Sequence, residues 1–233
     1  IIATLFTIWT PGSLLSNSLT EKMSLALQSR QENVENLPTP TARPQEPIGI
    51  VAGHWGNDSG AVCPDGVKEV DLNLEIATLV RNNLVSLGYT VDLLKEFDPN
   101  LYQYQGKLLL SIHNDSCEYI NNEATGFKVA AALATSAYPE KSNRLTACLI
   151  DRYAKATNMS FHYSSITHDM KEYHAFDEIN ASTPAAIIET GFMNLDREML
   201  TQHPDQIAAG VTSGILCFLN NELISPTSTP ATP

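Results

Sequence analysis

The stretch IGIVAGH at residues 48–54 sets a short apolar run directly before a glycine and a histidine. Apolar runs of this length that stop at a glycine are typical of strands buried inside a sheet. Comparable runs occur at residues 89–94, 107–112 and 185–188, and another begins at residue 126. The pattern therefore predicts a sheet whose strands are covered on both faces.

Segments with helical spacing separate these strands. Residues 71–87 place apolar side chains three and four positions apart, and Gly88 follows as a C-terminal cap. Residues 140–156 repeat the spacing, and a last helix begins at Pro204-Asp205. This alternation predicts an α/β fold: a single three-layer domain with a twisted, largely parallel central sheet flanked by helices. Functional residues of such folds gather beyond the carboxyl ends of the strands.

The chain outside this unit has a different composition. Residues 1–15 are apolar but shorter than the roughly 20 residues that span a bilayer. We interpret them as the tail of a signal sequence or membrane anchor, the alternative being a loose hydrophobic terminus. Residues 16–47 are predicted to be a disordered linker, residues 48–222 the single folded domain, and residues 223–233 a disordered tail rich in Pro, Thr and Ser. We expect an exported protein of the cell envelope, either tethered to the membrane by its N-terminal segment or secreted.

The charge of the chain narrows the choice of partners. The net charge is −12, and no long run of Lys or Arg occurs. Binding of nucleic acid requires a concentrated cationic surface, and so does a polybasic grip on anionic lipid. The sequence therefore argues against nucleic acid as a partner and favours a neutral or amphoteric substrate.

Four ionisable residues stand at the predicted ends of the secondary-structure elements. His54 and His113 each follow an apolar strand, Glu189 ends another, and Glu69 stands just before the long helix. Two imidazoles and a carboxylate can bind Zn²⁺ and leave one coordination position for water, while a second carboxylate can act as general base. Each residue alone has a simpler interpretation: a hydrogen-bonded structural histidine, a charge favourable to the helix dipole for Glu69, or a buried ion-pair member for Glu189.

Four motifs around these residues resemble the zinc-dependent N-acetylmuramoyl-L-alanine amidases of the Amidase_3 type. The motifs are GHWGNDSGAVCPDGVKEVDLNLEIA, SIHND, TGFKV and PAAIIETGFMN, in this order. The resemblance implies that His54, Glu69 and His113 are zinc ligands and that Glu189 is the catalytic glutamate. It further implies hydrolysis of the amide bond between N-acetylmuramic acid and L-alanine in peptidoglycan.

The sequence also departs from this family. Val51-Ala52 stands where Asp-Pro is usual, so support for the metal ligands must come from other residues. An alternative function is therefore a catalytically weak or inactive module that binds the cell wall or serves as a scaffold subunit, and another is a zinc peptidase that cuts the stem peptide. The sequence identifies no protein partner.

The remaining histidines of the second half and the cysteines carry weaker predictions. We expect Cys63 and Cys117 to form a disulfide near the site, because both follow strands at the same sheet edge. Cys148 and Cys217 fall on apolar helix faces and are interpreted as small buried hydrophobic residues. Three histidines of residues 159–183 are expected to face solvent, with one of them as a candidate to contact the reacting carbonyl: His162, His168 and His174.

Overall fold

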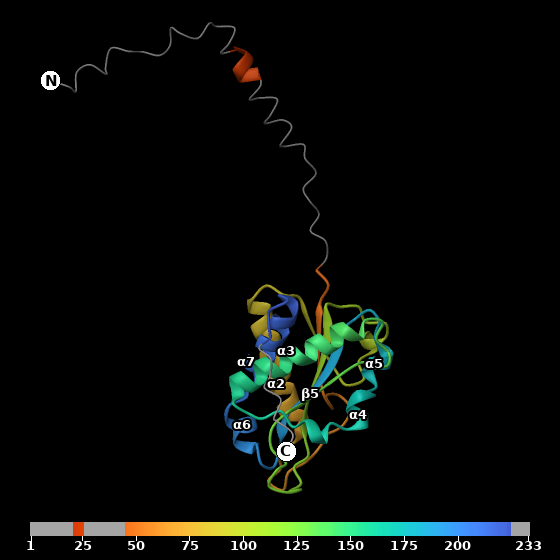
Figure 1. The fold of residues 1–233 in the computed structure, drawn as a ribbon, viewed down its shortest axis with the longest axis vertical. Helices are drawn as coiled ribbons and strands as arrows, with labels where there is room; N and C mark the ends of the chain where they lie inside the picture. Colours follow the sequence, from red (N-terminus) through yellow and green to blue (C-terminus); the bar gives the residue numbers. More distant parts are fainter. Residues whose placement is uncertain (1–20, 26–44, 225–233) are drawn as a thin grey trace, which may run out of the picture. The chain divides into compact units, whose positions relative to one another are not determined.

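The computed structural model describes residues 21–25 and 45–224. Residues 21–25 are helical, and the larger part forms a sheet with helices against both faces (Figure 1). The strands are β1 (Ile48–Ala52), β2 (Val91–Leu94), β3 (Leu108–Asp115), β4 (Lys128–Ala131) and β5 (Ala185–Phe192). The helices are α2 (Glu69–Ser86), η2 (Pro99–Leu101), α3 (Pro139–Thr157), η3 (Tyr163–Ser165), α4 (His168–Lys171), α5 (Ala175–Glu178), α6 (Arg197–Gln202) and α7 (Pro204–Leu219).

The sheet is largely parallel, as predicted. Its five strands lie in the order β2-β1-β3-β5-β4, and only β4 runs antiparallel to its neighbour. The central strands β1 and β3 are buried along almost their whole length, because both faces of the sheet are covered. The parallel strands all point the same way, so their carboxyl ends share one edge of the sheet.

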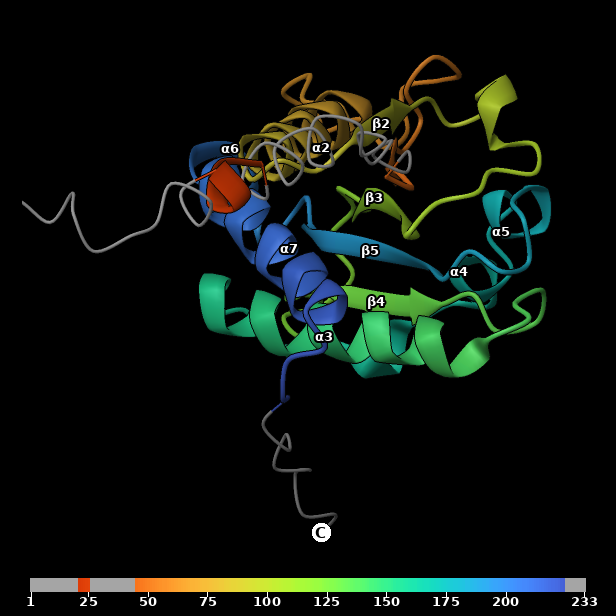
Figure 2. The same cartoon turned by 90° about the horizontal axis from the view of Figure 1, so that it is seen from above.

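Alternate residues of each strand pack into two different cores. Ile48 and Ile50 of β1 belong to the core formed with α2, α3 and α7. Val51 of the same strand belongs to the opposite core, which includes Phe176 of α5. Figure 2 shows α2, α3 and α7 together on one side and α4 and α5 on the other. The predicted three-layer α/β domain is thus confirmed.

A disulfide joins α3 to α7, so the prediction that Cys148 and Cys217 are only small buried hydrophobic residues is wrong. Both are fully buried, and their Cα atoms lie 5.7 Å apart. Gly214 lets the helices approach this closely, because a Cβ at that position would lie 2.8 Å from the Cα of Leu149. Helical spacing reveals the buried face of each helix, but it does not reveal which buried residues of two helices oppose each other.

The second disulfide confirms the predicted pairing of Cys63 with Cys117. The two Cα atoms lie 5.3 Å apart, within the range that the bond requires. The bond links the loop before α2 to the loop after β3 across 54 positions of sequence. It therefore joins the two loops that follow His54 and His113.

Loss of the Cys148–Cys217 bond is expected to destabilise the domain strongly. The bond spans 69 positions of sequence, and closing a loop of that length restricts the unfolded chain by about 4 kcal/mol in the chain-entropy model. The double variant Cys148→Ala, Cys217→Ala should lower the free energy of unfolding in denaturant by up to that amount. The unfolded, unreduced wild-type chain should show no titratable thiol; free thiols together with unchanged stability of the variant would contradict the bond.

The predictions for the two ends of the chain fall mainly outside the described residues. This holds for residues 1–15, for most of residues 16–47 and for nearly all of residues 223–233. Within the part of the chain that the structure describes, no helix is long and apolar enough to cross a membrane.

Candidate active site

The four ionisable residues predicted from the sequence lie together near the carboxyl edge of the sheet. His54 lies just beyond β1, and Glu69 is the first residue of α2. His113 of β3 and Glu189 of β5 are direct partners in the register of the two strands. Because registered residues of neighbouring parallel strands project from the same face, the imidazole and the carboxylate are neighbours.

The strand ends differ in detail from the prediction. His113 was expected to follow its strand and Glu189 to end its strand, whereas both lie inside their strands. The reason is that β3 continues to Asp115 and β5 to Phe192, and the two strands remain paired through a register shift after His113. This irregularity, a bulge-like feature, is common next to functional sites.

Glu69 lies between the two histidines. Its Oε1 is 3.1 Å from Nε2 of His54 and 3.3 Å from Nδ1 of His113. One ligand atom from each of these three residues lies within 4.8 Å of the other two. The three side chains therefore form a group that can hold a metal ion.

Buried amides fix the carboxylate of Glu69. Asn73, one turn later on α2, donates from Nδ2 to Oε1 at 3.1 Å, and the backbone N–H of Ala61 donates to Oε2 at 3.1 Å. Asn73 in turn accepts a hydrogen bond from Asn114, which accepts one from Thr190. This chain of bonds ties α2 to β3 and β5, so the ligand group is held by three elements at once.

The backbone around the first histidine is adapted to its position. His54 has a φ of 64°, in the left-handed region that few residues other than glycine adopt. Gly53 allows the ring of His113 to lie against the chain, because a Cβ there would be 2.3 Å from the Cε1 atom of that ring. Nδ1 of His54 is 2.6 Å from the carboxylate of Asp58. An imidazole whose Nδ1–H donates to a carboxylate presents its Nε2 lone pair to a metal.

The three ligand candidates also influence one another's protonation. The hydrogen bond with Glu69 raises the pKa of His54 to about 9, against the opposing effect of burial. Burial alone would raise the pKa of Glu69, but hydrogen bonds from His113 and His54 outweigh burial and hold this pKa well below its usual range. Metal binding at this group would therefore displace a proton from His54.

Glu189 has a different environment from Glu69. Burial raises the pKa of its carboxyl group to about 7, and the charge of Lys128 opposes this rise. Nζ of Lys128 lies 2.5 Å from Oε2 of Glu189 and also pairs with Asp115. Both carboxylates thus share one buried lysine. A carboxyl group with a pKa near 7 can accept and return a proton at neutral pH.

Sequence reasoning missed three charged residues that contact this site: Asp58, Glu96 and Lys128. Lys128 could have been found from the sequence, because a lysine inside the apolar run at residues 126–132 is unusual for a buried strand. Glu96 could also have been found, because it follows β2 at the same edge of the sheet as the other site residues. Of the three further histidines, His162 and His174 are partly buried, so the expectation that all three face solvent is wrong for these two; Nε2 of His174 lies 2.9 Å from Glu96. The side chain of His168 is 76% exposed.

A family model described as N-acetylmuramoyl-L-alanine amidase matches residues 48–217, which is well over half of the chain. The chain belongs to this amidase family. The predicted family and the predicted enzyme class are thereby confirmed. A comparison with curated proteins finds no match.

Solved amidase structures share the fold. The N-acetylmuramoyl-L-alanine amidase from Clostridium difficile 630 has a TM-score of 0.61 and 22% identity, covering 78% of this chain and 100% of that chain. The amidase Ami1 from Mycobacterium smegmatis has a TM-score of 0.59 and 16% identity, covering 76% and 98%. The CwlD amidase from Clostridioides difficile, solved in complex with the GerS lipoprotein, has a TM-score of 0.58 and 20% identity, covering 76% and 100%.

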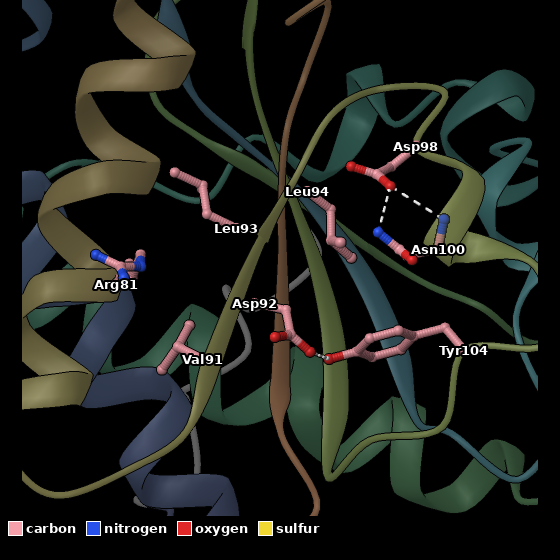
Figure 3. A pocket seen from close by; sticks show the side chains of 8 residues that line it. All are labelled: Arg81, Val91, Asp92, Leu93, Leu94, Asp98, Asn100 and Tyr104. Atoms are coloured by element: carbon pink, nitrogen blue, oxygen red, sulfur yellow. Dashed lines mark hydrogen bonds between the residues drawn. The ribbon is translucent and has the colours of Figure 1, made fainter.

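Two surface pockets differ in their relation to the site. A pocket of about 720 Å³ lies beside the edge strand β2 and contains none of the four predicted site residues (Figure 3). A second pocket, of about 620 Å³, lies between the loop before α2 and the loop after β3. It is lined by Ala61, Val62, Pro64, Ser116, Cys117, Glu118, Tyr119 and Asn194. Since Ala61 donates to Glu69, this second pocket adjoins the ligand group.

Proposed function

We propose that this amidase is a zinc-dependent peptidoglycan hydrolase that cleaves the amide bond between N-acetylmuramic acid and L-alanine. The observation that carries the proposal is the convergence of His54, Glu69 and His113 beside Glu189 at the carboxyl edge of the sheet. Membership of the amidase family supports the choice of bond.

The donor set fits zinc. Tetrahedral zinc with ligands at about 2.0–2.1 Å separates neighbouring ligand atoms by about 3.3 Å. The distances from Oε1 of Glu69 to the two imidazole nitrogens, 3.1 and 3.3 Å, match this spacing. Two neutral imidazoles and one carboxylate are also a ligand set typical of catalytic zinc. We therefore assign His54, Glu69 and His113 as the residues that would hold the ion.

Glu189 would act as general base and then as general acid. When bound, zinc would supply a Lewis acid that polarises the amide carbonyl and a water molecule. Glu189 accepts the proton of the attacking water and returns it to the departing nitrogen of L-alanine. Lys128 keeps the carboxylate of Glu189 in place between β4 and β5, and Asp115 balances the charge of this lysine.

The pocket of about 620 Å³ between the two disulfide-linked loops supports the proposal that the substrate is peptidoglycan. Its lining contains both apolar and polar side chains, among them the exposed Tyr119 and the polar Ser116 and Asn194. An aromatic ring can pack on the face of a sugar, and polar side chains can bind a peptide backbone. We propose that part of the glycan strand or stem peptide lies here.

We also propose that the domain works in the cell envelope, attached through residues 1–15 or secreted. Two disulfides support this location, because such bonds persist in oxidising compartments and are rare in the cytosol.

The proposed zinc dependence can be tested on purified peptidoglycan. We expect the full chain to release wall fragments, a chelator to stop the release, and added zinc to restore it. Release that continues in the chelator would contradict the proposed chemistry. Binding to the wall with no release, with or without zinc, would instead favour the alternative of a non-catalytic binding module.

A further inference from the structure

Glu96 is a buried carboxylate in the turn after β2, and its side chain is only 7% exposed. Its Oε2 accepts the backbone N–H of His54 at 2.6 Å. Its Oε1 accepts the hydroxyl of Tyr173 at 2.8 Å and lies 2.9 Å from Nε2 of His174. A buried carboxylate with this many donors remains ionised, and its pKa is lowered to about 2 because these bonds outweigh the effect of burial.

The same carboxylate faces the second proposed zinc ligand. Oε2 of Glu96 is 3.6 Å from Nε2 of His113. This nitrogen is buried and has no hydrogen-bond partner among the described residues. The other ring nitrogen, Nδ1, points to Glu69. A carboxylate beside Nε2 favours the tautomer with the proton on that atom, which leaves the lone pair of Nδ1 free.

The geometry points to Glu96 as a positioning residue that holds His54 and His113 ready to bind zinc. This inference rests on the proposed function, because it concerns the same metal group. Carboxylates that accept the outer N–H of a histidine ligand fix its tautomer and orientation. Asp58 has this relation to His54. Glu96 faces the outer nitrogen of His113 at 3.6 Å, too far for a hydrogen bond but close enough for its charge to favour a proton on that atom. Glu96 adds a second effect through the backbone N–H of His54.

No residue of β1 can take over this role. Val51 is apolar and packs in the core beneath α4 and α5, so the strand that leads to His54 carries no carboxylate toward the ligands. Tyr173 steadies Glu96 from the other side: its hydroxyl bridges Glu96 and Ser111 of β3, and its ring lies edge-on to His113 at 5.5 Å. The network thus joins β2, β3 and the segment before α5.

The test is the zinc affinity of Glu96→Gln, measured on the full chain by competition with a chelating dye. Glutamine keeps the size of the side chain and an acceptor for the N–H of His54 but removes the charge. We expect zinc to bind about 10- to 100-fold more weakly, the loss typical of such outer carboxylates. The absorption spectrum of the cobalt-substituted variant should also change, since the ring of His113 is less constrained.

Asp92→Asn is the matched control. Asp92 is also a carboxylate near β1, but it accepts from the hydroxyl of Tyr104 at 2.9 Å within the β2 pocket and contacts no ligand candidate (Figure 3). We expect this variant to bind zinc as the wild type does. The melting temperatures of the zinc-free variants separate a loss of fold from a loss of zinc affinity.

Each outcome of this experiment is decisive. Zinc affinity of Glu96→Gln within about twofold of wild type, with a lowered zinc-free melting temperature, would show that Glu96 only anchors the segment around Tyr173 and would overturn the inference. If Glu96→Gln does not fold, Tyr173→Phe takes its place, and an unchanged zinc affinity there would overturn it equally. A wild-type chain that binds no zinc would instead overturn the proposed function and this inference with it.

Discussion

Replacing His113 by alanine is expected to remove most of the bound zinc and nearly all amide cleavage. The side chain is 11% exposed and supplies one of three ligand atoms. Loss of one imidazole leaves two protein ligands, too few for a stable catalytic zinc site. Elemental analysis of the purified variant, together with release of wall fragments, measures both effects.

His168→Ala is the control for His113→Ala. His168 lies at the start of α4, is largely exposed and pairs only with Glu172 in the described part of the chain. We expect this variant to keep both zinc and cleavage. His54→Ala should lose zinc as His113→Ala does, because Nε2 of His54 is a second member of the ligand group. Full zinc retention in the His113 variant would show that the ligand assignment is wrong.

Glu189→Gln is expected to keep zinc while losing about 10²- to 10⁴-fold in the rate of cleavage. Glutamine matches glutamate in shape but cannot accept a proton near neutral pH. The fold should persist, because the buried Lys128 retains Asp115 as a partner. The measurement pairs zinc content with the cleavage rate in the same preparation, with the exposed Glu198→Gln as control.

The pH dependence of the cleavage rate gives a second test of Glu189 as the general base. The base must be deprotonated, and burial raises the pKa of Glu189 to about 7, so the wild-type rate should fall as the pH drops through this range. A bound zinc ion, as a nearby positive charge, would move this acid limb to lower pH. The residual cleavage rate of Glu189→Gln should not fall in this way at low pH. Zinc loss in this variant would place Glu189 among the ligands, and a near wild-type rate would exclude it as the base.

The sequence predicted the fold because the apolar runs and the helical spacing each report burial on a local scale. The same reasoning found the site, since His54 comes just after an apolar strand and His113 and Glu189 lie in two others, near the edge where the strands of a parallel sheet end together. Glu69 could be added only through the motif that surrounds it, because an acidic residue at the start of a helix is common.

The partners of these residues could not be predicted in the same way. Lys128 meets Glu189 across the antiparallel pair of β4 and β5, far apart in sequence, and the register of that pair is not visible in either strand alone. Glu96 reaches both histidines only after β2, β1 and β3 are placed side by side. The bond between Cys148 and Cys217 likewise depends on how two helices face each other. Local patterns report burial, whereas these contacts depend on the relative placement of distant elements.

Mass analysis of purified peptidoglycan digested by the full chain tests the central proposal most directly. We expect products in which the amino group of L-alanine is free and N-acetylmuramic acid keeps its lactyl carboxylate, and we expect no such products in a chelator. Cleavage between residues of the stem peptide, with the bond between N-acetylmuramic acid and L-alanine intact, would contradict the account and identify a peptidase.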